Sequence, residues 1–247
     1  RLSQKAAMGA VHGVYLKYVG LGTLCGVAAY SLNDHSSALG SALKYSAGVN
    51  LIIAALFQLQ RGQFILGKSE KDGSVPLWSY LLWSAFHGPT WLYTFLHTEL
   101  GKISGTPVAS EVYDGWYIGG VYSYELKEAW AGVLDLTVEF PENCIGQTMA
   151  YKLVPVWDGT PPTPQQLEEA AEFCVAARAR GKVLVHCAHG RGRSTCCMVA
   201  ALTKAGAFAT WEDAFDACKK KRPVVKLNSK MRRALKAWAE DYQKKQE

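Results

Sequence analysis

Apolar residues are distributed unevenly along the chain, and three long runs of them fall within the first hundred positions. They extend over about residues 14–32, 38–58 and 75–97. A helix that crosses a bilayer needs about 20 mostly apolar residues, and each run comes close to that length. Small residues are frequent in the first two runs, which suits close packing of helices in lipid. The pattern therefore predicts a helical membrane region over residues 1–100, with two or three spans.

Charged and helix-breaking residues leave other interpretations of this region open. Lys17 and Lys44 lie inside the first two runs, so a buried helical subdomain of a soluble protein is the alternative, although a lysine near a helix end can extend to the interface. The third run contains His87-Gly88-Pro89. Because a proline interrupts a straight helix, this run is expected to form a span, a re-entrant element or an interfacial element.

From about residue 111 the pattern changes to short apolar runs that alternate with helical periodicity. Strands are expected over residues 113–121, 132–138, 151–157 and 182–186. Helices are expected over residues 164–181, 194–205, 211–221 and 228–243. Strands that alternate with helices indicate an α/β domain with a largely parallel sheet flanked by helices. We expect this domain over residues 106–247, after the turn-forming stretch Gly101–Pro107.

Charge and cysteine content support this division. Residues 1–105 contain 8 Lys and Arg and 4 Asp and Glu, whereas residues 106–247 contain 19 and 17. The 7 cysteines form no regular framework and no C-x-x-C pair, so reduced thiols are expected and a structural metal is not. Ala217–Ala239 contains nine basic residues and no acid. This run is interpreted as a solvated face or a contact with anionic headgroups, and nucleic-acid binding ranks low because no binding motif accompanies it.

The candidate chemistry lies between the fourth expected strand and the helix after it. The loop reads Cys187-Ala-His-Gly-Arg-Gly-Arg193. A helix N-terminus presents free N–H groups and the positive end of a dipole, so this loop is suited to bind an anion. Gly190 and Gly192 allow the backbone to direct successive N–H groups at one phosphate, and Arg193 can bind two of its oxygens. The same field lowers the pKa of Cys187 and makes it a nucleophile.

Further residues around the loop have candidate roles. Asp158 lies 29 residues before Cys187 in a turn-rich loop, where it can act as the general acid or only cap the turn; Glu142 is a weak competitor. Ser194 can donate a hydrogen bond to the cysteine sulfur or be a plain residue at the helix N-terminus. His186 is expected to order the loop by hydrogen bonds.

The string His186-Cys-x5-Arg-Ser194 resembles the signature of the cysteine-dependent protein tyrosine phosphatase superfamily. Tyr117–Gly120 and Lys221–Asn228 are similar to the opening and closing segments of its dual-specificity branch. The resemblance covers about residues 111–240 and implies that the thiolate needs no separate base, metal or cofactor. A vaguer similarity extends to membrane-anchored bacterial and plant members. The residues that would bind the substrate phosphate are Ala188, His189, Gly190, Arg191 and Gly192.

These observations predict a multi-pass membrane phosphatase, with its catalytic domain on a reducing side, that hydrolyses phosphate monoesters through a phosphocysteine. Arg191 adds a second cation to the loop, which favours a phospholipid headgroup as substrate. The alternatives are a dual-specificity protein phosphatase acting on phosphotyrosine, phosphoserine and phosphothreonine, and a structural or phosphate-binding subunit of a membrane assembly. Sulfur transfer, which also uses a Cys-headed anion loop, is disfavoured by Asp158 and by the Arg193–Ser194 pair.

Overall fold

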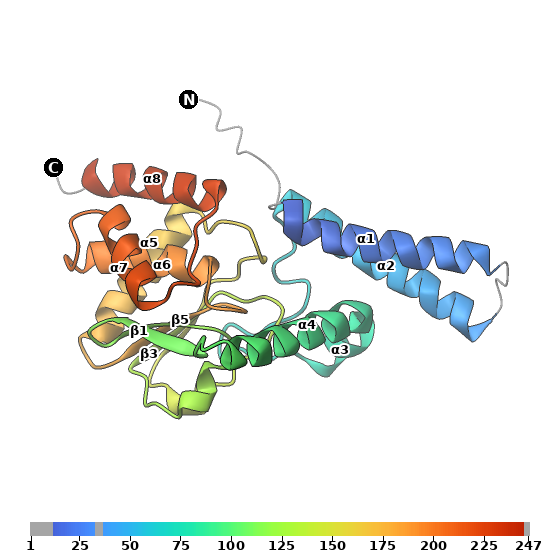
Figure 1. The fold of residues 1–247 in the computed structure, drawn as a ribbon, viewed down its shortest axis with the longest axis horizontal. Coiled ribbons are helices and arrows are strands. Elements are labelled where there is room, and N and C mark those ends of the chain that lie inside the picture. The colour runs from blue at the N-terminus through green and yellow to red at the C-terminus, as the bar shows by residue number, and fades with distance from the viewer. Residues whose placement is uncertain (1–11, 33–36, 245–247) are drawn as a thin grey trace.

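The computed structural model describes residues 12–32 and 37–244 and consists of a helical part followed by an α/β part (Figure 1). The remaining positions of the expected membrane region, residues 1–11 and 33–36, lie outside the described residues. Helices α1 (His12–Ser31) and α2 (Ala38–Leu59) lie side by side as a hairpin that projects away from the α/β part. Gly22 permits this close packing, because a Cβ there would lie 2.9 Å from the side chain of Leu51.

Only one described helix, α2, is long and apolar enough to cross a membrane by length and composition. Just 28% of its most apolar window is buried, whereas a core helix of a soluble protein is mostly buried. The expected multi-pass topology with two or three spans is therefore not supported. Lys17 and several glycines and polar residues make α1 less apolar than its length suggests.

The third apolar run is divided into α3 (Leu77–Leu82) and α4 (Ser84–Ile103). The interruption lies at Trp83, and Pro89 is accommodated inside α4, so the expected break at Pro89 was wrong. Proline has no N–H to donate to the carbonyl four residues earlier, which is that of Ala85. The side-chain amide of Asn50 on α2 donates to this carbonyl at 3.3 Å. The neighbouring helix thus compensates for the missing hydrogen bond.

The α/β part contains a mixed five-stranded sheet in the order β1-β2-β5-β3-β4. The strands are β1 (Ala109–Tyr113), β2 (Trp116–Gly119), β3 (Gly132–Asp135), β4 (Tyr151–Leu153) and β5 (Val183–His186). β1 and β2 pair antiparallel, and all other pairs are parallel. β5 is central, so its carboxyl end lies between those of β2 and β3 and is enclosed by their loops.

Helices α5 (Pro164–Arg178), α6 (Arg193–Lys204), α7 (Trp211–Lys221) and α8 (Ser229–Lys244) lie together on one side of the sheet (Figure 1). Val183 and Val185 contact the core under these helices, while Leu184 belongs to a smaller cluster on the other face. This alternation follows from the twofold period of a strand. Two short 3₁₀ helices, Ser123–Leu126 and Ile145–Gln147, lie in the loops that flank β3.

A second apolar cluster joins the helical part to the α/β part. It combines Ile53 and Phe57 of α2 and Phe86 of α4 with Val138 and Trp157 of the α/β part. These side chains are all almost completely buried. Residues from both sides of the expected boundary at residues 101–107 therefore form one common core.

Candidate functional site

The loop that follows β5 turns directly into α6, as the sequence predicts. Gly190 has φ +65°, and a Cβ at this position would lie 2.6 Å from the carbonyl group of Gly119, so both the conformation and the space require glycine. Gly192 has φ −117°, and a Cβ there would lie 3.2 Å from Cε of Met231. A positive φ therefore requires glycine at Gly190, whereas the role of Gly192 in shaping the loop stays a prediction.

The thiol of Cys187 lies at the start of this loop and is 3% exposed. Its sulfur is 3.3 Å from the hydroxyl oxygen of Ser194. Burial alone would raise the pKa of Cys187, but the Arg193 guanidinium and hydrogen bonds from Ser194 hold it below its ordinary value. Burial raises the pKa values of the other buried thiols, at Cys144, Cys174, Cys196, Cys197 and Cys218. The loop thus favours a thiolate, and hence a nucleophile, at Cys187.

The guanidinium of Arg193 is fully buried and held by acceptors on two neighbouring loops. Its two terminal nitrogens contact both carboxylate oxygens of Glu139, at 2.7 and 3.2 Å, and Nη1 also donates to the carbonyl of Val156 at 2.7 Å. Among the described residues, Nε–H of Arg193 has no acceptor. We expected the planar fork to bind phosphate; because Glu139 occupies its outer edge, the Nε edge is the side available to an anion.

Asp158 lies at the other wall of the site, with Oδ1 3.2 Å from Nη2 of Arg193. Its side chain is 41% exposed, so it can reach a substrate. Burial alone would raise the pKa of Asp158, but the charge of Arg193 lowers it, so the carboxyl is ionised when the loop is empty of anion. A bound phosphate dianion would offset Arg193 and raise this pKa, which would supply the proton that a general acid needs.

The competitor Glu142 is buried, and its Oε2 lies 2.6 Å from Nε2 of His186. Asp135 of β3 is close to both, and these three residues could in principle hold a metal ion. Instead the ammonium of Lys68, from the segment between α2 and α3, forms a buried ion pair with Asp135 and donates to the carbonyl of Thr137 at 3.0 Å. Burial would lower the pKa of His186, but the charges of Glu142 and Asp135 raise it to about 9. His186 is therefore a charged member of a neutral cluster behind the loop.

The variable positions of the loop contact the helical part of the chain. The His189 ring lies 4.4 Å from the ring of His97 on α4, and burial lowers its pKa to about 4, so it is neutral at physiological pH. Arg191 is half-buried at the mouth of the site, and the carbonyl of buried Ala188 accepts from the N–H of Val121 at 3.2 Å.

Arg222 had been expected to lie on a basic, solvated or headgroup-facing segment, but it is 2% exposed. Its Nε donates to the carbonyl of Gly190 at 2.9 Å, and Nη2 to that of His189 at 3.3 Å. A third contact, from Nη1 to the carbonyl of Pro107, lies at 2.9 Å. Arg222 therefore supports the loop, because it supplies the hydrogen-bond donors that two of the buried loop carbonyls need.

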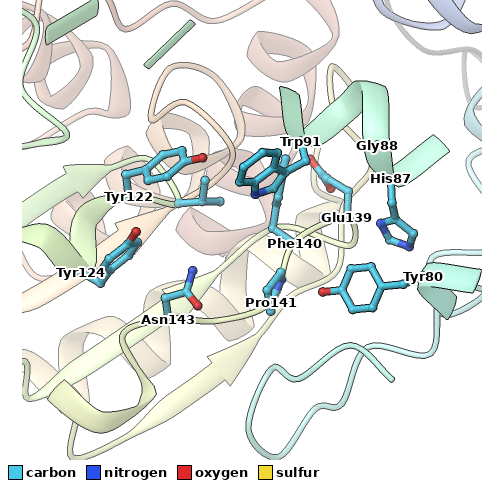
Figure 2. Close-up of a pocket in the computed structure, with 11 residues that line it drawn as sticks. Tyr80, His87, Gly88, Trp91, Tyr122, Tyr124, Glu139, Phe140, Pro141 and Asn143 are labelled. Carbon is cyan, nitrogen blue, oxygen red and sulfur yellow. The ribbon is translucent and has the colours of Figure 1, made fainter. Parts of the chain in front are cut away.

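Three cavities meet around the site. A cavity of about 370 Å³ is lined by Cys187, Asp158 and Arg193. A second, of about 170 Å³, shares Asp158 and His189 with it and extends along α1 and α4. A third, of about 420 Å³, shares Glu139 and Phe140 with the second. Figure 2 shows that aromatic rings from both parts of the chain surround this third cavity: Tyr80, Trp91, Tyr122, Tyr124 and Phe140.

Sequence reasoning missed Glu139, Lys68 and Arg222. No role was expected for Glu139, yet its carboxylate positions Arg193. A carboxylate just past an expected buried strand that ends beside the loop was the available signal. Lys68 had no signal, because the turn-rich segment around it gives no indication of which buried carboxylate it would meet.

Comparisons with known proteins give one family model and several solved structures. The family model "Dual specificity phosphatase, catalytic domain" matches residues 130–241. A mouse putative dual specificity phosphatase complexed with zinc tungstate has 24% identity and a TM-score of 0.50, covering 56% of this chain and 91% of that one. A single-residue variant of human DUSP28 has 24% identity and a TM-score of 0.50, and the match covers 56% of this chain and 99% of that one. PTPMT1 in complex with PI(5)P has 18% identity and a TM-score of 0.49, and the match covers 57% of this chain and 100% of that one.

Proposed function

We propose that this chain is a cysteine-dependent phosphatase of the dual-specificity type, and that it hydrolyses a phosphate monoester on a phospholipid headgroup at a membrane surface. The observation that carries the chemistry is the placement of Cys187, Arg193 and Asp158 on one cavity. Its loop combines a helix N-terminus with a thiol of lowered pKa. Such an arrangement binds a phosphate and attacks it.

The proposed reaction has two steps. In the first, the thiolate of Cys187 attacks phosphorus in line while Asp158 protonates the leaving oxygen, so that a phosphocysteine and a free alcohol form. In the second, Asp158 takes a proton from water, the water oxygen attacks phosphorus, and the thiolate and inorganic phosphate are released. The loop N–H groups and Nε of Arg193 stabilise the charge in both transition states, and Ser194 stabilises the departing thiolate.

The lipid part of the proposal is supported by the distribution of exposed apolar side chains. Among the described residues, 23 large exposed hydrophobic side chains lie between Leu16 and Ile103, and in the α/β part only Tyr113, Leu126, Ile145 and Met149. An apolar surface of this extent marks a membrane or protein contact. The cavities that lead from Cys187 along α4 are lined by apolar and aromatic residues of the same helices, which suits a substrate with an apolar body.

The test compares phosphate release by the full chain in mixed micelles on phospholipid monoesters, on short-chain soluble forms of the same headgroups, and on phosphotyrosyl and phosphothreonyl peptides. We expect the highest kcat/KM on the long-chain lipids, with no loss on addition of a chelator. Cys187→Ser should abolish turnover while substrate binding persists. Higher kcat/KM on the peptides would replace the lipid by a phosphoprotein. No Cys187-dependent release from any substrate would favour a phosphate-binding subunit.

A further inference from the structure

We propose that the N-terminal helices are a working part of the active site, because α2 and α4 position the general-acid loop through Trp157. This inference rests on the proposed role of Asp158. It concerns residues 57–86, which lie outside the segment that the family model matches. Phe57, Arg61 and Phe86 are thereby assigned as positioning residues that act through Trp157 and do not touch the substrate.

Trp157 is fully buried, and its aromatic neighbours and the acceptor of its indole N–H come from the helical part of the chain. The ring of Phe57 on α2 lies 4.5 Å from the indole, and that of Phe86 on α4 lies 6.3 Å away in an edge-on orientation. The indole Nε1–H donates to the carbonyl of Arg61, just past the end of α2, at 2.8 Å. Ring packing and hydrogen bond together fix both the position and the rotation of the indole.

A third helix completes the enclosure of Trp157. The ring of Tyr18 on α1 packs 5.3 Å from Phe57 and 5.4 Å from Phe86. Its hydroxyl lies 3.2 Å from that of Thr90 on α4. Tyr18 therefore contacts both phenylalanine rings that pack on the indole, and α1, α2 and α4 meet at this point.

The backbone transmits this position to the next residue, which carries the acid. The carbonyl of Trp157 accepts from the N–H and the hydroxyl of Thr160, at 3.1 and 2.7 Å, so the turn around Asp158 is closed on the tryptophan itself. Gly159 within this turn has φ +73°. A tight turn closed on a fixed indole leaves Asp158 little freedom, and a displacement of the indole would move its carboxyl away from the leaving oxygen.

The experiment uses the full chain in detergent micelles and separates acid catalysis from general stability. Trp157→Phe removes the hydrogen bond to Arg61 and keeps a ring, while Phe57→Leu removes the ring contact and keeps apolar volume. Each variant is assayed on 4-nitrophenyl phosphate, whose leaving group needs no proton, and on a short alkyl phosphate, whose leaving group does. Since general acid catalysis contributes about 10²–10⁴ in rate, we expect kcat/KM on the alkyl phosphate, which reports only the steps up to formation of the phosphocysteine, to fall about tenfold or more. The kcat/KM on the aryl phosphate should change about twofold or less, because its leaving group needs no proton.

A matched control is available at Trp238 on α8. This indole is also buried, and its Nε1–H donates to Glu168 at 2.7 Å, so Trp238→Phe removes an equivalent hydrogen bond remote from Asp158. Thermal unfolding of all variants is recorded in parallel. We expect Trp238→Phe to lower the melting temperature without changing the ratio of alkyl to aryl rates.

Asp158→Asn separates the two proposals. If it lowers the alkyl-to-aryl ratio but Phe57→Leu and Trp157→Phe do not, the positioning role is overturned and the chemistry of the proposed function stands. If Asp158→Asn itself leaves the ratio unchanged, the assignment of the general acid falls and the positioning role falls with it. Equal losses of kcat/KM on both substrates, like those of an unstable protein, would also overturn the proposal. The lipid preference is not involved, because neither substrate is a lipid.

Discussion

Two side chains, Arg193 and Ser194, stabilise the negative charge of the Cys187 thiolate in different ways. Arg193 stabilises the thiolate electrostatically, but its own guanidinium is neutralised by Glu139 and Asp158. Ser194 has no such competing partner among the described hydrogen bonds, and its hydroxyl lies 3.3 Å from the sulfur. Ser194 is therefore the residue whose effect on the leaving thiolate can be isolated.

Ser194→Ala is expected to slow breakdown of the phosphocysteine more than its formation. The hydrogen bond to the sulfur stabilises the thiolate, which is the leaving group of the second step, and a hydrogen bond to a charged group is worth about 1.5–3 kcal/mol. We expect kcat to fall roughly 10- to 100-fold, with a burst of alcohol release before the steady state in rapid-quench assays. Unchanged kcat without a burst would leave Ser194 as a plain helix N-terminal residue.

At the scale of elements, the loop after β3 connects the helical part to the catalytic loop. Asp135 and Thr137 receive Lys68, Glu139 holds Arg193, and Glu142 holds His186. This short segment therefore contains the ion-pair partners of His186 and Arg193, the residues at the two ends of the catalytic loop. The segment is itself held by Lys68, which lies 67 residues before Asp135 in the chain.

Lys68→Met should destabilise the fold, because it leaves Asp135 as an uncompensated charge in a buried site. Breaking a buried pair in this way costs about 3–5 kcal/mol, which chemical denaturation would measure as a loss of unfolding free energy. The double variant Lys68→Met, Asp135→Asn removes both charges and should recover most of that loss. A double variant as unstable as the single one would show that the ion pair is not the source of the effect.

The limits of sequence reasoning are visible in the same elements. The strands and helices around Cys187 were predictable, because the spacing of apolar residues along each segment records which face of that segment is buried. Pro89 was misjudged because its compensation comes from Asn50 on another helix. Glu139 and Lys68 escaped for the same reason: their roles are fixed by partners far away in the sequence, and no local pattern records such partners.

At the scale of the molecule, the apolar surface of the helical part is the feature that the α/β part lacks. Leu24 on α1 is 69% exposed, and Leu51 on α2 is 45% exposed. Both residues lie on the hairpin that projects from the α/β part (Figure 1), and only contact with lipid or another apolar surface would remove their exposed area from water. Membrane attachment through the hairpin follows as a proposal, with α2 as its candidate span.

This attachment predicts protection of the hairpin in vesicles. A fluorophore on Leu24→Cys, in a Cys25→Ala background, should be quenched by lipid-borne quenchers and shielded from aqueous iodide. The same fluorophore on Met149→Cys, which is 75% exposed on the α/β part, should show the opposite pattern. Cys187 is the reactive thiol of the site, so both variants also carry Cys187→Ser; the other described cysteines are buried, which limits unwanted labelling. Equal iodide quenching at both positions would argue that the hairpin lies in water.

The burial of Trp157 against α2 and α4 also has a consequence for biogenesis. Its partners Phe57, Arg61 and Phe86 leave the ribosome long before it, since Trp157 and Arg61 are 96 residues apart. Because domains form during synthesis from the N-terminus onward, the helices would already have been synthesised when the tryptophan arrives. The acid loop would then fold against a surface that is already present, so the order of synthesis favours a helical part that is complete before the active site.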